Sequence, residues 1–441
     1  MNNPQPISFA QALRFWLKLG FISFGGPAGQ ISIMHQELVE RRRWISEGRF
    51  LHALNYCMLL PGPEAQQLAT YIGWLMHGTL GGITAGVLFV LPSLFILILL
   101  SWIYIAFGEL PVIAALFFGI KPAVTAFVVH AAWRIGSRAL KTPFLWILAL
   151  LSFLATVLFA MPFPVIVAVA ALIGFAANRL APDNFHGVSG HGHAGKDYGP
   201  ALIDDHSERL LHTHYSVFKL GRTVITGCLL WLAPMLALIG SVGWQHTFTQ
   251  MAWFFTKAAL LTFGGAYAVL PYVYQGAVDT EGWLTAAQMI DGLALGETTP
   301  GPLIMVVAFV GFVGAYANEV LGADAQFLAG AIAATLVTWF TFLPSFVFIL
   351  AGGPAIESSR GELHLTAPLI AITAAVVGVI GNLAMFFAYH VLWPTGFEGA
   401  FDWQSLLLAL SAAAALFCFK RGVIEVLLGC ALCGLLLIFL F

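Results

Sequence analysis

The sequence predicts an all-α polytopic membrane protein with two homologous halves of inverted topology, each containing broken or re-entrant helices. The first observation is composition: of 441 residues, 60% are hydrophobic and 9% charged, whereas roughly a quarter of a soluble domain is charged. The second is an internal repeat, and the third is the number of apolar segments. Together they exclude a soluble globular fold, and the net charge of −2 gives no case for a nucleic-acid partner.

The repeat consists of rare residues that recur 239 positions apart. Between 15–78 and 254–317 we count 13 identities in 64 positions, without a gap. The recurring elements are Lys18, Phe24-Gly25-Gly26, Trp44 and Pro61-Gly62-Pro63, which return as Lys257, Phe263-Gly264-Gly265, Trp283 and Pro300-Gly301-Pro302. A Leu-Pro-Ser triplet at 91–93 returns at 343–345, at an offset of 252. The chain therefore contains two copies of one membrane unit.

Each half contains six apolar segments. They are 8–40, 47–79, 82–107, 110–137, 143–160 and 162–179 in the first half, and 250–278, 286–318, 325–351, 366–391, 403–419 and 422–441 in the second. We divide the chain into a first repeat at 1–180, a linker at 181–222, an extra span at 223–242 and a second repeat at 243–441. If each half crosses the membrane an even number of times, the extra span inverts the second half, as in many secondary transporters.

Basic residues orient these segments, because Lys and Arg accumulate on the cytoplasmic side. Residues 1–222 hold 15 Lys/Arg and 10 Asp/Glu, whereas 223–441 hold 4 and 11. Arg134, Arg138 and Lys141 close the fourth segment and are interpreted as anchors of its cytoplasmic end. The linker is therefore expected in the cytoplasm, and the loop with Asp279 and Glu281 on the opposite side.

The arginines at 41–43 and 49 conflict with this orientation if segments 8–40 and 47–79 each cross once. Each segment has about 33 residues and a Gly/Pro break at its middle, which is long for one straight span of about 20 residues. Re-entrant hairpins would return these arginines to the cytoplasm. Tilted full spans are the alternative.

Backbone that leaves helical geometry inside a membrane must line a cavity or be enclosed by protein. A Pro in the first helical turn suits the start of a half-helix, whose free N–H groups favour an anion, and Gly permits close backbone approach. Kinks that serve only helix packing are the alternative. The backbone positions predicted to bind an anion are Gly25, Gly26, Pro61, Gly62, Pro63, Gly264, Gly265, Pro300, Gly301 and Pro302.

Three lysines are predicted to add positive charge to this site. Lys18 and Lys257 lie about ten residues into their segments, roughly 15 Å deep on a helix that rises 1.5 Å per residue. Burial at that depth is costly and favours a functional site, while snorkelling to the headgroups is the alternative. Lys121 has the same two interpretations, and its counterpart in the second half is Ala367.

Two acids beside the breaks are candidates for proton coupling. Glu64 follows the first Pro-Gly-Pro directly, and Glu297 precedes the second by three residues. An embedded carboxyl can carry a proton or balance a lysine, although Glu64 can also be a partner of the helix dipole.

The linker holds His186, His191, His193, His206, His212 and His214, for which a solvated connector is favoured over a metal site. No metal or cofactor is expected. The sequence lacks HExxH, GxSxG, Walker and haem motifs, so no enzymatic activity is predicted.

The ordered motifs resemble the chromate ion transporter family in its long two-domain form, over nearly the whole chain apart from the linker. They are Phe24-Gly25-Gly26-Pro27, Trp44, Leu60-Pro61-Gly62-Pro63-Glu64, Gln67-Leu68-Ala69, Leu91-Pro92-Ser93 and Gly119-Ile120-Lys121-Pro122-Ala123-Val124. The resemblance implies a multi-pass carrier in the bacterial inner membrane that exports chromate, a sulfate-like dianion, and confers resistance. Ala266, Leu303 and Ala367 replace Pro27, Glu64 and Lys121 in the second half, which favours the first half as the richer site.

The expected partners are chromate or a related oxyanion and the lipid bilayer, and a homodimer is left open. A carrier for another oxyanion such as sulfate, an anion channel and a membrane enzyme are the alternative functions. A channel would conduct without saturation, and an enzyme would alter its substrate.

Overall fold

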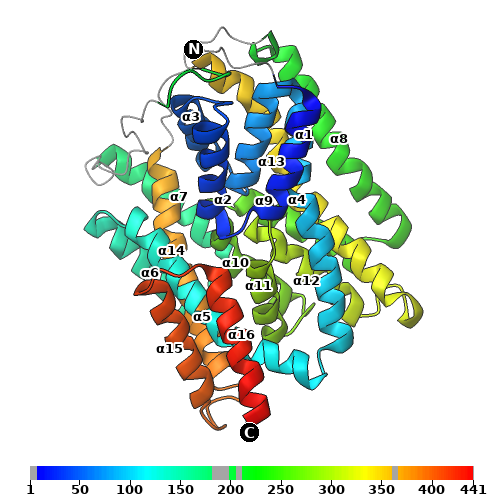
Figure 1. Cartoon of the computed structure of the whole chain (residues 1–441), viewed down its shortest axis with the longest axis vertical. Coiled ribbons are helices and arrows are strands. Elements are labelled where there is room, and N and C mark those ends of the chain that lie inside the picture. The colour runs from blue at the N-terminus through cyan, green and yellow to red at the C-terminus, as the bar shows by residue number, and fades with distance from the viewer. Residues whose placement is uncertain (1–6, 181–197, 205–210, 360–365, 441) are drawn as a thin grey trace.

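The computed structural model describes residues 7–180, 198–204, 211–359 and 366–440, and these residues form helices joined by short loops (Figure 1). Four of the six linker histidines, at positions 186, 191, 193 and 206, lie outside the described residues. Among the residues that the structure describes, six helices are long and apolar enough to cross a membrane. They fall within α4 (Glu64–Phe107), α5 (Pro111–Ala139), α7 (Phe163–Leu180), α8 (Val217–Val242), α13 (Gln326–Ser359) and α14 (Thr366–Leu392). The prediction of an all-α membrane protein is confirmed.

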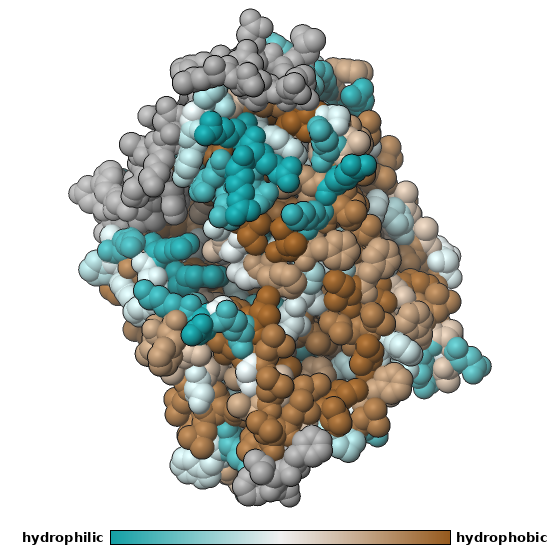
Figure 2. Space-filling model, in the orientation of Figure 1, coloured by the Kyte–Doolittle hydropathy of each residue, from teal (hydrophilic) through white to brown (hydrophobic). Residues whose placement is uncertain are grey.

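Shorter apolar helices complete each half: α6 (Pro143–Phe159) in the first, and α15 (Trp403–Phe417) and α16 (Val423–Leu440) in the second. Their outward side chains are largely hydrophobic. Hydrophobic residues cover most of the lower and right-hand parts of the face in Figure 2, whereas hydrophilic residues gather in the upper part over α1–α3 and at the left at mid-height. An apolar surface of this extent suits contact with lipid acyl chains rather than water.

The first two apolar segments are broken in the middle. Helix α1 (Phe9–Ile22) is followed by α2 (Gly26–His35) and a π-helix, η1 (Gln36–Arg41), and α3 (Glu47–Leu59) is followed by α4. A helix of 14 residues such as α1 is about 21 Å long at 1.5 Å per residue, which is too short to span a bilayer. Within α4 the backbone leaves helical geometry at His77 and Gly78, so that the residues before and after this turn form two packed helices.

The second half repeats this arrangement with α9 (Thr247–Leu261), α10 (Ala266–Tyr274), the π-helix η4 (Gln275–Thr280), α11 (Ala286–Thr298), the short η5 (Leu303–Met305) and α12 (Val306–Ala317). The short η6 (Ala323–Ala325) then leads into α13. The two π-helices occupy positions that differ by 239 residues, the offset of the sequence repeat. The next turn also repeats, because the Trp44 and Trp283 amides donate 2.8 Å hydrogen bonds to Leu38 O and Ala277 O. The two halves are thus copies in structure as well as in sequence.

The loop before α3 lies beside the described part of the linker. Leu202 N donates to Arg43 O at 3.0 Å, and Ile203 N donates to Trp44 O at 3.1 Å. In Figure 1, α1–α3 lie in the upper part of the molecule with the N-terminus, whereas α10–α12 lie lower. This arrangement supports re-entrant hairpins over tilted full spans, with the hairpins of the two halves entering from opposite sides.

We expect thiol labelling to report the same topology. Cysteines placed at the exposed positions Arg41 and Glu281 should react with an impermeant thiol reagent from opposite sides of the membrane, because the two loops are counterparts in inverted halves. Labelling of right-side-out and inverted vesicles is the measurement. Reaction of both positions from one side would contradict the inverted repeat.

Candidate functional site

The four helix breaks meet in the middle of the molecule through reciprocal backbone hydrogen bonds. Gly62 N donates to Thr262 O, and Gly301 N donates to Ser23 O, each at 2.8 Å. Gly301 is the repeat counterpart of Gly62, and Thr262 is the counterpart of Ser23. Each Pro-Gly-Pro therefore pairs with the residue before the Phe-Gly-Gly of the other half. We call residues 23–26, 60–64, 262–265 and 299–302 the central junction.

The repeated Leu-Pro-Ser triplets explain why glycine is needed at the centre of each Pro-Gly-Pro. A Cβ atom on Gly62 would lie 2.3 Å from Ser345 Oγ, and one on Gly301 would lie 2.8 Å from Ser93 Cβ. The φ angles of these glycines are 128° and 101°, which L-residues rarely adopt. Each serine thus packs against the glycine of the opposite half, so both triplets contact the central junction.

Half-helices begin at the junction without side-chain caps. Gly25 precedes α2, Pro63 precedes α4 and Gly265 precedes α10, and none of these residues caps its helix through a side chain. Pro302 likewise precedes η5 without a side-chain cap. Uncapped N-termini present N–H groups and partial positive charge, which favour a bound anion. The structure thus gathers all ten predicted backbone positions at one place.

Two glutamine side chains of the first half reach into the junction. Gln30 Nε2 donates to Gly301 O at 2.5 Å, and Gln67 Nε2 donates to Pro61 O at 2.8 Å. The Oε1 atoms of both glutamines and the Ser93 hydroxyl are buried and have no hydrogen-bond partner among the described residues. The second-half counterparts of the glutamines are Val269 and Val306. The polar lining of the junction is therefore asymmetric, and the first half supplies more of it.

One acid from each half lies at the junction. Glu64 is the first residue of α4 and is partly exposed, and its Oε1 lies 3.8 Å from the point that a Cβ on Gly265 would occupy. Glu297 is buried and accepts a hydrogen bond from the Tyr267 hydroxyl. Both proton-coupling candidates are thus brought to the junction.

Arg134 supplies positive charge that the sequence interpretation missed. Its Nη2 atom lies 3.9 Å from the point that a Cβ on Gly26 would occupy, and its charge acts on both Glu64 and Glu297. Arg138, one turn later, is exposed, as expected of a helix-end anchor. A signal was available, because Arg134 stands inside the predicted apolar segment 110–137 rather than beyond its end.

The structure does not bring the three predicted lysines to the junction. Lys18 and Lys257 are exposed on the outer surface, and the Lys257 ammonium lies 5.7 Å from the centre of the Trp253 ring. This placement favours the snorkelling alternative for both. Lys121 Nζ instead pairs with Asp291 Oδ2 at 3.2 Å. The three lysines therefore lie away from the central junction, whereas Arg134 lies beside it.

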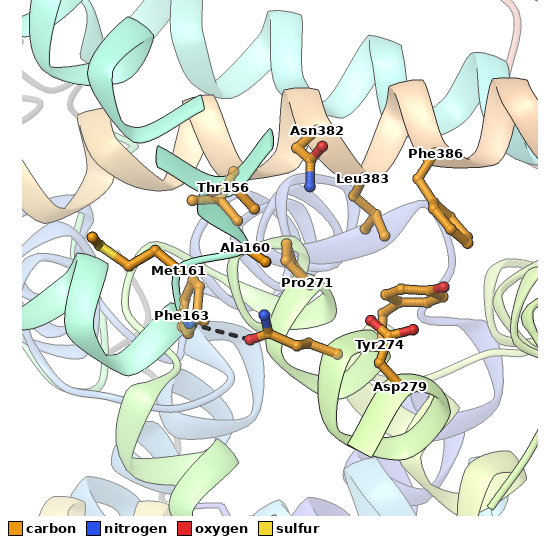
Figure 3. A pocket seen from close by; sticks show the side chains of 12 residues that line it. Thr156, Ala160, Met161, Phe163, Pro271, Tyr274, Asp279, Asn382, Leu383 and Phe386 are labelled. Atoms are coloured by element: carbon orange, nitrogen blue, oxygen red, sulfur yellow. Dashed lines mark hydrogen bonds between the residues drawn. The ribbon is translucent and has the colours of Figure 1, made fainter. Parts of the chain in front are cut away.

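A small cavity of about 160 Å³ lies beside η4 and is less suited to an anion (Figure 3). Tyr274, Asp279 and Asn382 provide its polar groups, and Gln275 Oε1 accepts a 3.3 Å hydrogen bond from Phe163 N. No basic side chain lines it, and Asp279 would repel an anion. The central junction remains the better candidate.

Comparisons with known proteins agree with the two-half architecture. The family model described as "Chromate transporter" matches residues 10–175 and 249–435, one match in each half. A "Chromate transport protein" of Pseudomonas aeruginosa is 32% identical over 98% of this chain and 93% of its own length. A "Chromate transport protein" of Cupriavidus metallidurans is 27% identical over 99% of this chain and 98% of its own length. The "Uncharacterized transporter YwrA" of Bacillus subtilis is 32% identical over 27% of this chain and 67% of its own length. No solved structure matches the chain. From the two family matches and these relatives, the chain is a member of the chromate transporter family.

Proposed function

We propose that this protein is a secondary transporter that exports chromate, a sulfate-like dianion, across the bacterial inner membrane through the central junction. The observation that carries the proposal is the convergence of uncapped helix N-termini on a junction flanked by Arg134. The names of the relatives from Pseudomonas and Cupriavidus support chromate as the substrate. Export from the cytoplasm would confer chromate resistance.

The chemistry of the junction suits a tetrahedral dianion. Backbone N–H groups can donate hydrogen bonds to several oxygens, and the guanidinium of Arg134 can bind two of them at once. The carboxyl groups of Glu64 and Glu297 oppose the substrate charge when ionised. Proton uptake by one of them would therefore favour anion binding, and Glu64 is the better candidate because it is partly exposed.

The membrane potential is sufficient to drive export. Each elementary charge that crosses 100 mV gains about 2.3 kcal/mol, so a dianion that leaves a negative cytoplasm gains about 4.6 kcal/mol. This free energy corresponds to a concentration ratio of more than about a thousandfold. Nucleotide hydrolysis is not required, consistent with a sequence that has no Walker motif.

We expect electrogenic, ATP-independent flux in liposomes that contain the purified protein. Potassium and valinomycin set the potential at fixed pH, and chromate flux should rise as the compartment holding chromate becomes more negative. Flux that ignores the potential but follows a pH gradient would exclude uniport and indicate that compensating protons make the cycle electroneutral.

The same assay separates the alternative functions. Chromate, sulfate, molybdate and phosphate are offered singly and in competition, because the first three share a tetrahedral dianionic shape. Preference for sulfate would identify a carrier for another oxyanion, conductance without saturation would indicate a channel, and chemical change of the oxyanion would indicate an enzyme.

A further inference from the structure

A buried acid of the second half is held by two side chains of the first half on the linker side of the junction. Glu357 of α13 is 2% exposed. Its Oε2 pairs with Arg49 Nη1 of α3 at 2.6 Å, and its Oε1 accepts a 2.5 Å hydrogen bond from the Tyr71 hydroxyl. We call these three residues the linker-side clamp.

The same chemistry recurs on the other side of the junction. Asp291 of α11 is also 2% exposed. Its Oδ2 pairs with Lys121 Nζ of α5 at 3.2 Å and accepts a 2.8 Å hydrogen bond from the Tyr104 hydroxyl of α4. We call these residues the far-side clamp. In both clamps, a basic side chain and a tyrosine of the first half bind a carboxylate side chain of the second half.

The clamps lie on opposite sides of the junction along the hairpin helices. Arg49 precedes Leu60 by 11 residues on α3, or about 17 Å of helix, and α3 starts at the loop beside the linker. Asp291 precedes Thr299 by eight residues on α11, or about 12 Å, and α11 enters from the opposite side. One contact between the halves therefore lies on each side of the junction.

A large pocket adjoins the far-side clamp. It has a volume of about 790 Å³ and is lined by Lys121, Ile290, His390 and Gln404, among others. The Lys121 side chain is 33% exposed, whereas that of Asp291 is 3% exposed. The lysine therefore forms part of the pocket wall, whereas the acid that it pairs with is buried.

We infer that the two clamps are the gates of the transport cycle, each closing one path between the junction and a membrane surface. This inference rests on the proposed transport through the junction. Transporters built from inverted repeats expose their site by movement of one part against another. A buried ion pair between such parts suits a gate. An intermediate state would leave one charge buried without its partner, which is costly, so the fully closed and fully open states are favoured. Both clamps are closed in this structure.

The experiment measures how fast a cysteine at the junction reacts from each side. Ser93→Cys is the reporter, because this side chain is buried against Gly301. The five native cysteines are changed to serine or alanine, including Cys57, which lies on α3 between Arg49 and the junction. An impermeant thiol reagent is added to right-side-out or inverted vesicles, without oxyanion. Glu357→Gln should speed labelling from the linker side by about tenfold or more, and Asp291→Asn should do so from the far side only.

The matched control is Glu37→Gln. Glu37 pairs with Arg41 at 2.6 Å, and Glu357 pairs with Arg49 at the same distance. Glu37 and Arg41 both lie within the first half, so their pair does not join the two halves. This variant should leave both labelling rates unchanged. If Glu357→Gln or Asp291→Asn fails to fold, Tyr71→Phe and Tyr104→Phe remove one hydrogen bond each and should give smaller shifts with the same sidedness.

Equal acceleration from both sides, or no change in any clamp variant, would overturn the inference. Labelling uses no oxyanion, so this outcome is independent of the substrate. Failure of chromate flux in liposomes with side-specific labelling intact would reject the proposed substrate and leave the gates in place.

Discussion

Chromate transport by Arg134→Gln is expected to fall about a hundredfold, equivalent to roughly 2.7 kcal/mol, without a matching loss of folded protein. Arg134 lies beside the N-terminus of α2 and acts on Glu64 and Glu297. Without it, a dianion at the junction faces two carboxyl groups, and the exposed Arg138, whose charge also acts on Glu64, balances them less effectively. The measurement is the initial flux in liposomes, normalised to the amount of folded protein.

Two control variants accompany this result. Lys18→Gln and Lys257→Gln remove exposed charges on α1 and α9. Each should change flux by less than about threefold, because surface charges contribute little once water and salt screen them. Loss of flux in the lysine variants with normal flux in Arg134→Gln would reverse our assignment of the cationic group.

Gly301→Ala is expected to destabilise the folded protein by about 3 kcal/mol, the sum of backbone strain and overpacking. The methyl group would meet Ser93 at 2.8 Å, and the backbone has a φ of 101°. The hydrogen bond from Gly301 N to Ser23 O would be strained as well. Thermal unfolding in detergent should show a lower midpoint than for the unmodified chain.

Two comparison variants separate the causes. Gly322 has a φ of 88° but no atom within 4 Å of its would-be Cβ, so Gly322→Ala reports backbone strain alone and should cost about 1–2 kcal/mol. Adding Ser93→Gly to Gly301→Ala should restore part of the lost stability, because it relieves the crowding but not the strain. Equal midpoints for Gly301→Ala and Gly322→Ala would show that the serine contact is unimportant.

The sequence repeat predicted the broken helices, because glycine and proline act locally on the backbone. It did not predict how the breaks pair. The contacts of Gly62 with Thr262 and of Gly301 with Ser23 join different halves, and repeat spacing carries no information about such contacts. The pairing of Lys121 with Asp291 was missed for the same reason.

The positions of the charged residues were harder to predict. Depth along α1 suggested a buried Lys18, but Lys18 shares its helix face with Leu17 and Phe21, which are 42% and 50% exposed. In a membrane protein, lipid-facing and core-facing residues are both apolar, so hydrophobic patterning does not distinguish the two faces. The general rule for basic residues places Arg134 at a helix end, whereas its guanidinium lies beside Gly26 at the junction.

Binding of the oxyanion where the four breaks meet can be tested by locating a heavy oxyanion in crystals of the full chain. Tungstate is a tetrahedral dianion with a strong anomalous signal. We predict one peak at the central junction, within hydrogen-bond distance of the amides that begin α2 and of the Arg134 guanidinium. An empty junction with tungstate bound beside Lys121 or Lys257 instead would contradict it.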